Sequence, residues 1–279
     1  MNINWKLKSA AFRIMDRLNL HESLYFLQKY VTRRSQIPVD GIQDDWERHD
    51  SVIKGIDGPI SLIEFGAGKT LRQNIFLYYE NELCINQTVV DIFDMLDLDL
   101  CQEAVDQIAV LLGKERKQVS SLDDLRRNLS IDYLAPYDLA NKCDYSGTFD
   151  LCISTNTLEH IPEPDIIKIS DNLKKALKAG AIISAIIDYT DHYSHTDSRI
   201  GQLNFLKYSE QEWSRHNTSL HYQNRMRHQD YRKIFADLGF SIEKDHVMRF
   251  AEPDIPVDRR FDADNIETFA LRGWFVLRR

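Results

Sequence analysis

The chain has 279 residues, of which 43% are hydrophobic and 28% charged, and its formal net charge is −8. These values are typical of a globular protein large enough to bury a full core. A negative net charge argues against binding to duplex nucleic acid, which requires a basic face, and no apolar run is long enough to cross a bilayer. The four cysteines lack metal-ligand spacing, which predicts reduced thiols in a cytoplasmic protein.

The N-terminal segment, residues 1–58, is predicted to form helices and loops that end at the turn-rich residues 55–59. Residues 1–34 carry seven Lys or Arg side chains against two acidic ones, although the whole chain is negative. In a helix, Trp5, Phe12, Met15 and Leu18 would share much of one face. This pattern predicts a helix that packs on the protein body or on a partner subunit. The alternative is a peripheral contact with anionic lipid at the inner face of the membrane.

From residue 59 onwards, apolar segments alternate with helical ones. Strands are predicted at residues 60–65, 88–92, 130–134, 149–154 and 181–188. Helices are predicted at residues 69–80, 98–112 and 165–177, with Gly180 ending the last of these. This alternation predicts a Rossmann-like, doubly wound α/β sheet with right-handed crossovers.

The fifth strand is followed by an insertion, residues 189–229, that is rich in His, Tyr, Asn and Arg. A helix at residues 229–238 and strands at residues 240–250 and 268–277 complete the chain. Two successive strands without a helix between them predict an antiparallel pair, so the sheet is mostly parallel with an antiparallel C-terminal strand. Residues 59–279 are therefore predicted to form one domain, in which the charged residues 251–266 are either a lid or disordered.

The segment IEFGAGKT, residues 63–70, contains parts of two nucleotide-binding motifs. A phosphate-binding P-loop needs a glycine five positions before Gly68, where the chain has Ile63. A dinucleotide site needs a third glycine at position 71, where the chain has Leu71. Asp91, however, follows Gly68 by 23 residues, close to the spacing of an acidic residue that binds ribose. The pattern favours an adenosine ligand without a pyrophosphate.

At these residues the chain resembles the class I S-adenosylmethionine (SAM)-dependent methyltransferases. The resemblance rests on residues 64–68, on Asp91 after the second strand, and on residues 154–162 after the fourth, and it covers residues 59–190. It implies an enzyme that binds SAM and releases S-adenosylhomocysteine (SAH). The cofactor contacts that it implies are Glu64, Gly66, Ala67, Gly68, Asp91, Ile92, Asp132, Tyr133, Thr155 and Asn156.

The resemblance also implies a role for each contact. The backbone at the glycines approaches the methionine part, with Glu64 beneath it, and Asp91 accepts both ribose hydroxyls. Asp132 takes the adenine amino group, and Thr155 and Asn156 lie under the transferred methyl. The residues themselves also allow a helix cap at Asp91, a solvated charge at Glu64 and an ordinary turn at Asp132. His160 is interpreted as shaping the turn into the next helix.

Methyl transfer to a hydroxyl requires a general base or a metal ion, because the acceptor must lose a proton. Residues 188–197 bring together two histidines and three aspartates where the acceptor would enter. We predict His192 or His195 as the base, oriented by Asp188 or Asp191. Two alternatives stay open, namely a divalent cation that binds a sugar diol and a polar, hydrogen-bonded loop. No individual metal ligand is assigned.

Substrate contacts are predicted at Tyr193, Asn204, Arg225 and Arg227. The two arginines suit a phosphate or carboxylate on the substrate, although a solvated helix face accounts for them nearly as well. The insertion resembles those of methyltransferases in bacterial surface-polysaccharide biosynthesis, which implies O-methylation of a small molecule or glycan. The alternatives are a nitrogen or carbon acceptor, such as a quinone-like ring, and a non-catalytic SAM-binding scaffold.

Overall fold

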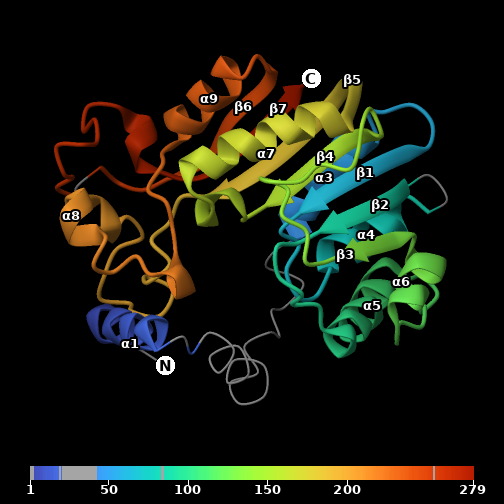
Figure 1. Cartoon of the computed structure of the whole chain (residues 1–279), viewed down its shortest axis with the longest axis horizontal. Coiled ribbons are helices and arrows are strands. Elements are labelled where there is room, and N and C mark those ends of the chain that lie inside the picture. Colours follow the sequence, from blue (N-terminus) through green and yellow to red (C-terminus); the bar gives the residue numbers. More distant parts are fainter. Residues whose placement is uncertain (1–2, 19, 21–42, 83–84, 254) are drawn as a thin grey trace.

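The computed structural model describes residues 3–18, 20, 43–82, 85–253 and 255–279. Its centre is a seven-stranded sheet with the strand order β3-β2-β1-β4-β5-β7-β6 (Figure 1). The strands are β1 (Ile60–Phe65), β2 (Ile85–Val90), β3 (Ile131–Leu134), β4 (Phe149–Thr155), β5 (Leu177–Asp188), β6 (Ser241–Phe250) and β7 (Ala270–Arg278). Neighbouring strands among the first five are parallel, whereas β7 is antiparallel to both β5 and β6. The predicted doubly wound sheet with an antiparallel C-terminal strand is confirmed.

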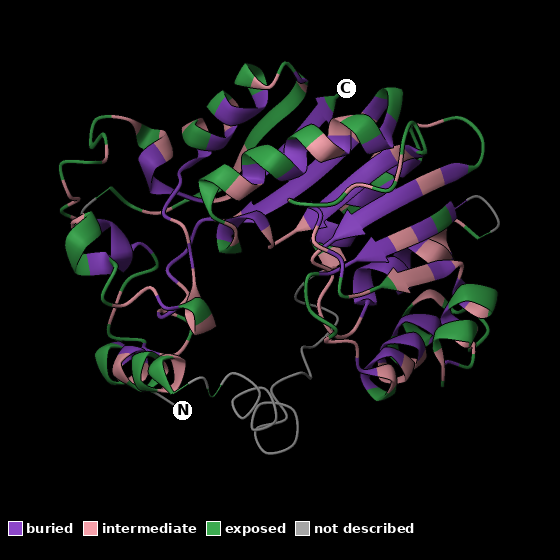
Figure 2. Cartoon of the chain, in the orientation of Figure 1, coloured by how far each residue is buried: buried purple, intermediate pink, exposed green. Residues whose placement is uncertain are grey.

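The helices lie on both faces of this sheet and at the insertion after β5. They are α1 (Trp5–Arg17), α3 (Gln43–Ile53), α4 (Arg72–Glu80), α5 (Leu98–Leu112), α6 (Leu122–Leu129), α7 (Glu163–Ala176), α8 (Glu210–Trp213) and α9 (His228–Asp237). Alternate residues of β1 enter two different buried clusters: Leu62 packs with α3, α4 and α5, whereas Ile63 packs with α7 and α9. Since successive strand residues point to opposite faces, these clusters are the two cores that sandwich the sheet. Figure 2 shows the central strands buried between them, while the edge strand β6 is largely exposed.

Several predicted boundaries need correction. The helix α4 begins at Arg72 rather than at residue 69, and β2 begins at Ile85 rather than at residue 88. Gly180 does not end α7, because α7 ends at Ala176 and β5 begins directly at Leu177. Gly180 instead has a φ of 77° inside β5, where the β4–β5 register is irregular. The helix α6 was not predicted, although Ser121 caps its first turn by accepting the Asp124 N–H.

The helix α1 packs against the insertion, residues 189–229, which lies far from it in the sequence. The Trp5 N–H donates to Asp197 Oδ2 at 2.8 Å, and its ring lies 5.6 Å from the Tyr193 ring, centroid to centroid. The opposite side of α1 exposes Leu7, Ile14 and Leu18. The predicted partner or membrane contact of residues 1–34 stays a prediction, and residues 21–34 lie outside the described residues. No helix among the described residues has the length and apolar character of a membrane span.

Candidate active site

A cleft of about 510 Å³ opens at the carboxyl ends of β1, β2 and β4. The sheet order reverses between β1 and β4, and the loops after these two strands diverge there, which is where open α/β sheets bind ligands. The cleft walls come from three regions: the loops after the strands, the start of α7, and the short 3-10 helix η5 (Ser219–His221) of the insertion. A second cleft of about 460 Å³, between α7 and α9, lies away from the strand ends.

The glycine loop after β1 forms one wall. Gly66 and Gly68 have φ values of 75° and 70°, a backbone conformation that favours glycine. A Cβ at Gly66 would overlap the Thr157 side chain, whereas a Cβ at Gly68 would have no described atom within 4 Å. Gly66 therefore permits close packing of the loop after β4, and Gly68 exposes its backbone to the cleft. Ala67 packs towards the core and is not among the residues that line the cleft.

Asp91 lies where the sequence predicts it, directly after β2 and on the cleft wall. Its side chain is held by two backbone donors, because Oδ1 accepts from the Phe93 N–H at 3.2 Å and Oδ2 from the Gly68 N–H at 3.4 Å. Burial raises the pKa of this carboxyl. Each oxygen keeps a further lone pair, so Asp91 can accept two hydroxyl groups from a ligand. Ile92, the next residue, lines the same cleft.

Two other predicted cofactor contacts, Glu64 and Thr155, lie behind the glycine loop. Glu64 is 3% exposed and accepts hydrogen bonds from Gln73 Nε2 at 2.9 Å and Asn74 Nδ2 at 2.6 Å. Burial raises its pKa to about 8. The Thr155 hydroxyl donates to Gln73 Oε1 at 2.7 Å. Neither residue lines the cleft, and both instead hydrogen-bond to Gln73 of α4.

Glu64 and Thr155 belong to a buried chain of hydrogen bonds that reaches the N-terminal segment. The Thr155 proton points to Gln73, so Thr155 Oγ1 must accept from His49 Nε2, which lies at 2.8 Å. His49 Nδ1 then accepts from Ser184 Oγ at 2.8 Å, and that hydroxyl accepts from Trp274 Nε1 at 3.0 Å. Burial lowers the pKa of His49 to about 3, which keeps the ring neutral. His49 was not predicted from the sequence, because a single histidine in an amphipathic helix gives no sign of this series of hydrogen bonds.

The predicted adenine contact at Asp132 is corrected by the structure. Asp132 forms an ion pair with Arg126 Nε of α6 at 2.6 Å, and neither Asp132 nor Tyr133 lines the cleft. The chain turns back after β3, and the Tyr137 N–H donates to the Asp91 carbonyl at 2.7 Å. This turn brings Asp138 to the cleft wall, where Oδ1 accepts from the Ala140 N–H at 3.0 Å. Asp138, rather than Asp132, therefore lies on the cleft wall.

Four histidines gather at the insertion side of the cleft. The His192 ring centroid lies 4.9 Å from that of His160, 5.0 Å from that of His195 and 6.4 Å from that of His221. His192 Nε2 lies 3.5 Å from Asp188 Oδ2, so the predicted pairing of a histidine with an aspartate is present. However, the rings that line the cleft are His160 and His221, and the predicted bases His192 and His195 lie behind them.

The predicted contact Asn156 lies on the cleft wall between the glycine loop and the histidines. Its φ of 52° is unusual for a non-glycine residue, and its backbone N–H donates to the Ile186 carbonyl at 2.9 Å. Asn156 Oδ1 accepts from Arg272 of β7 at 3.1 Å. The loop after β4 is therefore fixed to the antiparallel strand.

Comparison with solved structures finds a similar fold in the magnesium protoporphyrin IX methyltransferase ChlM from Synechocystis PCC 6803, which was crystallised with bound SAH. The TM-score is 0.51 at 13% sequence identity, and the alignment covers 93% of this chain and 99% of ChlM. The chain has the class I methyltransferase fold.

Two other matched structures are of longer chains. The CurJ carbon methyltransferase matches with a TM-score of 0.42 and 15% identity over 79% of this chain and 48% of its own. The SAM-dependent methyltransferase SibL, in its apo form, matches with a TM-score of 0.47 and 13% identity over 86% of this chain and 57% of its own. The chain thus spans about half the length of each. No protein-family model matches the sequence, and no curated protein matches it significantly.

The insertion after β5 borders the cleft through residues 219–222, and its predicted substrate contacts are buried away from the cleft. Arg227 is 1% exposed and donates to the backbone carbonyls of Tyr189, Thr268 and Ala270. Arg225 is likewise buried and donates to the Phe205 carbonyl at 2.9 Å. Both arginines are therefore assigned a structural role instead of the predicted contact with substrate.

Tyr193, Asn204 and Asp191 also lie within the insertion. Asp191 is fully buried and accepts from the Tyr193 N–H at 2.9 Å and from Asn204 Nδ2 at 3.2 Å, and burial raises its pKa to about 6. The Tyr193 hydroxyl donates to the His216 carbonyl at 2.8 Å. Because these groups are occupied inside the insertion, we assign them to its folding rather than to substrate or catalysis.

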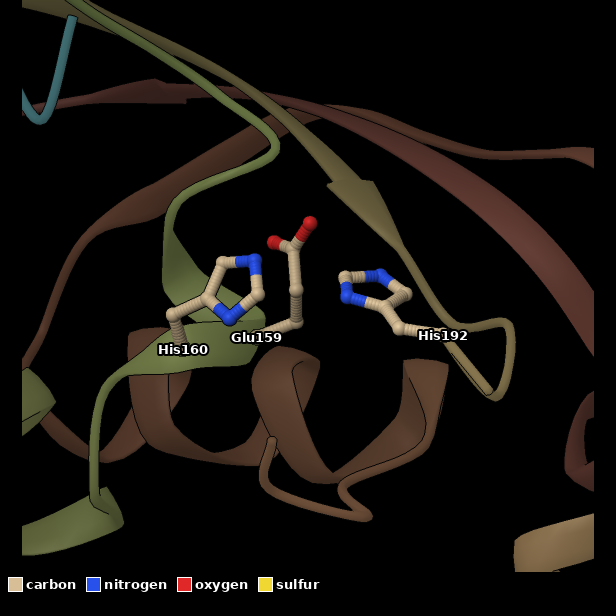
Figure 3. A group of neighbouring side chains, drawn as sticks. All are labelled: Glu159, His160 and His192. Carbon is tan, nitrogen blue, oxygen red and sulfur yellow. The ribbon is translucent and has the colours of Figure 1, made fainter. Parts of the chain in front are cut away.

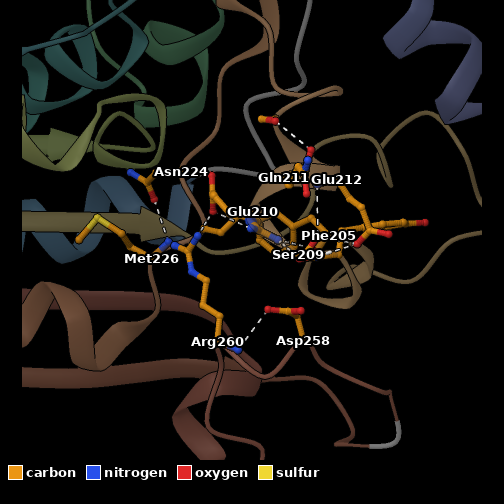
Figure 4. A network of polar contacts seen from close by, with 12 residues as sticks. Phe205, Ser209, Glu210, Gln211, Glu212, Asn224, Met226, Asp258 and Arg260 are labelled. Atoms are coloured by element: carbon orange, nitrogen blue, oxygen red, sulfur yellow. Dashed lines mark hydrogen bonds and ion pairs between the residues drawn. The ribbon is translucent and has the colours of Figure 1, made fainter.

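The outer part of the insertion is held by a polar network that includes the loop after β6 (Figure 4). Ser209 and Glu212 form a capping box at the start of α8. Glu210 forms ion pairs with Arg225 and Arg260, and the Asp258 N–H donates to the Leu206 carbonyl at 2.8 Å. The described part of the charged stretch 251–266 is therefore an ordered cover over the insertion.

Proposed function

We propose that the chain is a SAM-dependent methyltransferase that transfers a methyl group to a hydroxyl of a sugar or glycan. The observation that carries this proposal is the buried carboxylate of Asp91, placed beside the open backbone of Gly68 in a cleft at the switch point of the sheet. When bound, SAM supplies a methyl group on a sulfonium, which is already activated for displacement. The protein then has to hold the two reactants in line and to remove the acceptor's proton.

The residues of the cleft fit the adenosine part of SAM. Asp91 offers free lone pairs to the two ribose hydroxyls. Ile92 and Phe93, which are 52% and 64% exposed, offer apolar surface that an adenine ring would cover. Asp138 lies on the same cleft and can accept the adenine amino group. We propose these two aspartates as the polar contacts to adenosine.

We propose His221 as the group that accepts the proton from the acceptor. His221 lines the cleft, and its Nε2 is buried without a hydrogen-bond partner among the described residues. Burial, together with the nearby Lys8, lowers its pKa to about 3, so the ring is neutral at physiological pH. His192 and His195, predicted as bases, lie behind this first row and would act on the acceptor through it.

The sugar class rests on the polar character of the acceptor side, where Asn156, Ser219, His221 and Tyr222 face the cleft. Hydroxyl, amide and imidazole groups suit an acceptor with several hydroxyls. Surface-polysaccharide biosynthesis is supported by the resemblance of the insertion alone. A nitrogen or carbon acceptor would need less help from these groups, which is why the hydroxyl class is favoured.

The test is transfer of labelled methyl from SAM to panels of nucleotide-sugars, short glycans, amines and quinone-like rings, with SAH formation as the common readout. Labelled methyl on a sugar hydroxyl supports the proposal. Labelled methyl on a nitrogen or a ring carbon would show that the acceptor is an amine or a ring carbon instead of a hydroxyl. Saturable SAM binding without transfer to any panel would identify a non-catalytic scaffold.

A further inference from the structure

A second cluster of chemistry-bearing side chains adjoins the cleft and has no part in cofactor binding. Glu159 and His160 belong to the 3-10 helix η3 (Leu158–His160) after β4, and His192 belongs to the insertion after β5. One ligand atom from each of the three lies within 4.8 Å of the other two. In Figure 3 the Glu159 carboxylate stands between the two imidazole rings. Two segments more than 30 residues apart therefore bring three metal-binding groups to one point.

The Glu159 carboxylate has no conventional partner. Its side chain is 1% exposed, and neither oxygen has a side-chain donor or a well-aligned hydrogen bond in the described part of the chain, although the backbone N–H groups of Glu159 and Asp188 lie close to it. Burying an unpaired carboxylate is costly, so native structures supply a partner, a proton or a metal ion. The carboxylate of Asp188 lies nearby and adds negative charge. The nearby guanidinium of Arg272 offsets part of this negative charge, although its Nη2 already donates to Asp45 and Asn156.

The tautomer of His160 is fixed in the form that a metal requires. His160 Nδ1 lies 2.9 Å from the Tyr222 carbonyl oxygen, which can only accept a hydrogen bond. Nδ1 must therefore carry the proton, and the lone pair is left on Nε2. A backbone carbonyl or carboxylate that holds the second nitrogen is the usual support of a metal-bound histidine. Asp188, 3.5 Å from His192 Nε2, stands in a comparable position beside the other ring.

We propose that Glu159, His160 and His192 bind a divalent first-row transition metal ion, of which Zn²⁺ is the representative case. Two imidazoles and one carboxylate form the mixed nitrogen and oxygen set that such ions prefer over Mg²⁺ or Ca²⁺. Tetrahedral bonds of about 2.0–2.2 Å place ligand atoms about 3.4 Å apart, so the side chains close by up to roughly 1.4 Å on binding. Three protein ligands leave one coordination position for a small molecule.

The location gives the metal a use in the proposed reaction. His160 lines the cleft next to His221 and Tyr222, so a metal ion held by His160 would border the acceptor side of the cleft. It would make an acceptor hydroxyl more acidic, and His221 would be the group placed to take the proton. This use rests on the proposed function, whereas the metal site itself does not.

The experiment is a titration of the chelator-treated, full-length protein with Co²⁺ followed by visible absorption, and with Zn²⁺ followed by calorimetry. We expect one equivalent of each ion to bind, with the absorption of nitrogen- and oxygen-ligated Co²⁺. Glu159→Gln, which keeps the size of the side chain, should weaken binding at least 100-fold, and His192→Asn should do the same. His246→Asn, on the exposed face of β6, is the matched control and should bind as the wild type does.

The proposal is overturned if the wild type takes up no stoichiometric ion, or if Glu159→Gln binds it with unchanged affinity. Circular dichroism and a SAM titration on every variant, carried out without metal, distinguish loss of the site from loss of the fold. Metal binding without SAM binding would support this inference and reject the proposed function. SAM binding without metal binding would reject this inference and leave the proposed function standing.

Discussion

The buried Glu64 makes a quantitative prediction about stability and pH. In the folded chain burial raises its pKa to about 8 from an ordinary value of 4.5. Between these two pH values the unfolded chain has released the proton and the folded chain has kept it, so the free energy of unfolding falls as pH rises. At about 1.4 kcal/mol for each pKa unit, the loss between pH 4.5 and pH 8 amounts to about 5 kcal/mol. Below pH 4.5 the Glu64 carboxyl is protonated in both the folded and the unfolded chain, so its full contribution to stability is present there.

Glu64→Gln removes this titration and keeps the side-chain size. The measurement is urea unfolding of both proteins at pH 5 and pH 8.5. We expect the variant to lose about 3–5 kcal/mol less than the wild type over this interval, because other buried carboxyls titrate equally in both proteins. Glu252→Gln, an exposed control on the loop after β6, should follow the wild type. Parallel profiles for Glu64→Gln and the wild type would refute the account of a buried, proton-bound carboxyl beneath the glycine loop.

Three further predictions concern the loop, the base and the N-terminal helix. Gly66→Ala should lower the free energy of unfolding by about 2–4 kcal/mol, because the added Cβ overlaps Thr157 and the φ at this position is 75°. Gly68→Ala should lower it by only about 1–2 kcal/mol and should also reduce SAM affinity. Equal losses of stability in chemical denaturation would contradict the predicted difference between the two glycines. His221→Asn should lower turnover by about two to four orders of magnitude with SAM affinity unchanged, and steady-state kinetics within a few fold of wild type would remove its role as the base. Trp5→Ala, which empties an aromatic cluster with Tyr193 and Trp213, should lower the free energy of unfolding by about 3–5 kcal/mol and make α1 sensitive to limited proteolysis. Stability and proteolysis equal to those of the wild type would contradict the packing of α1 on the insertion.

The fold was predictable because its strands are short apolar runs separated by helices of clear period, and the predicted and observed α5 agree at both ends. The position of Asp91 followed from the same pattern, since it ends the second strand. Asp138 was missed because β3 stops at Leu134 and the chain then turns back over the cleft. Sequence spacing gives no sign of that turn.

The acceptor side was harder to predict because its residues are arranged by tertiary contacts. Arg227 resembles a substrate-binding arginine in the sequence, yet its guanidinium donates to three backbone carbonyls, one at the start of the insertion and two near the start of β7. Glu159 and His160 were interpreted as turn residues, and their proximity to His192 depends on how the loops after β4 and β5 pack. Burial and partners, rather than residue type, distinguish these roles.

The most direct test of the central claim is calorimetric titration of SAM and SAH into the wild type, Asp91→Asn and Asp132→Asn. The account predicts one saturable site in the wild type, an affinity at least about 100-fold weaker in Asp91→Asn through loss of charge-assisted hydrogen bonds, and an unchanged affinity in Asp132→Asn, whose carboxylate faces Arg126. Absence of saturable binding to the wild type, or equal weakening in the two variants, would contradict it.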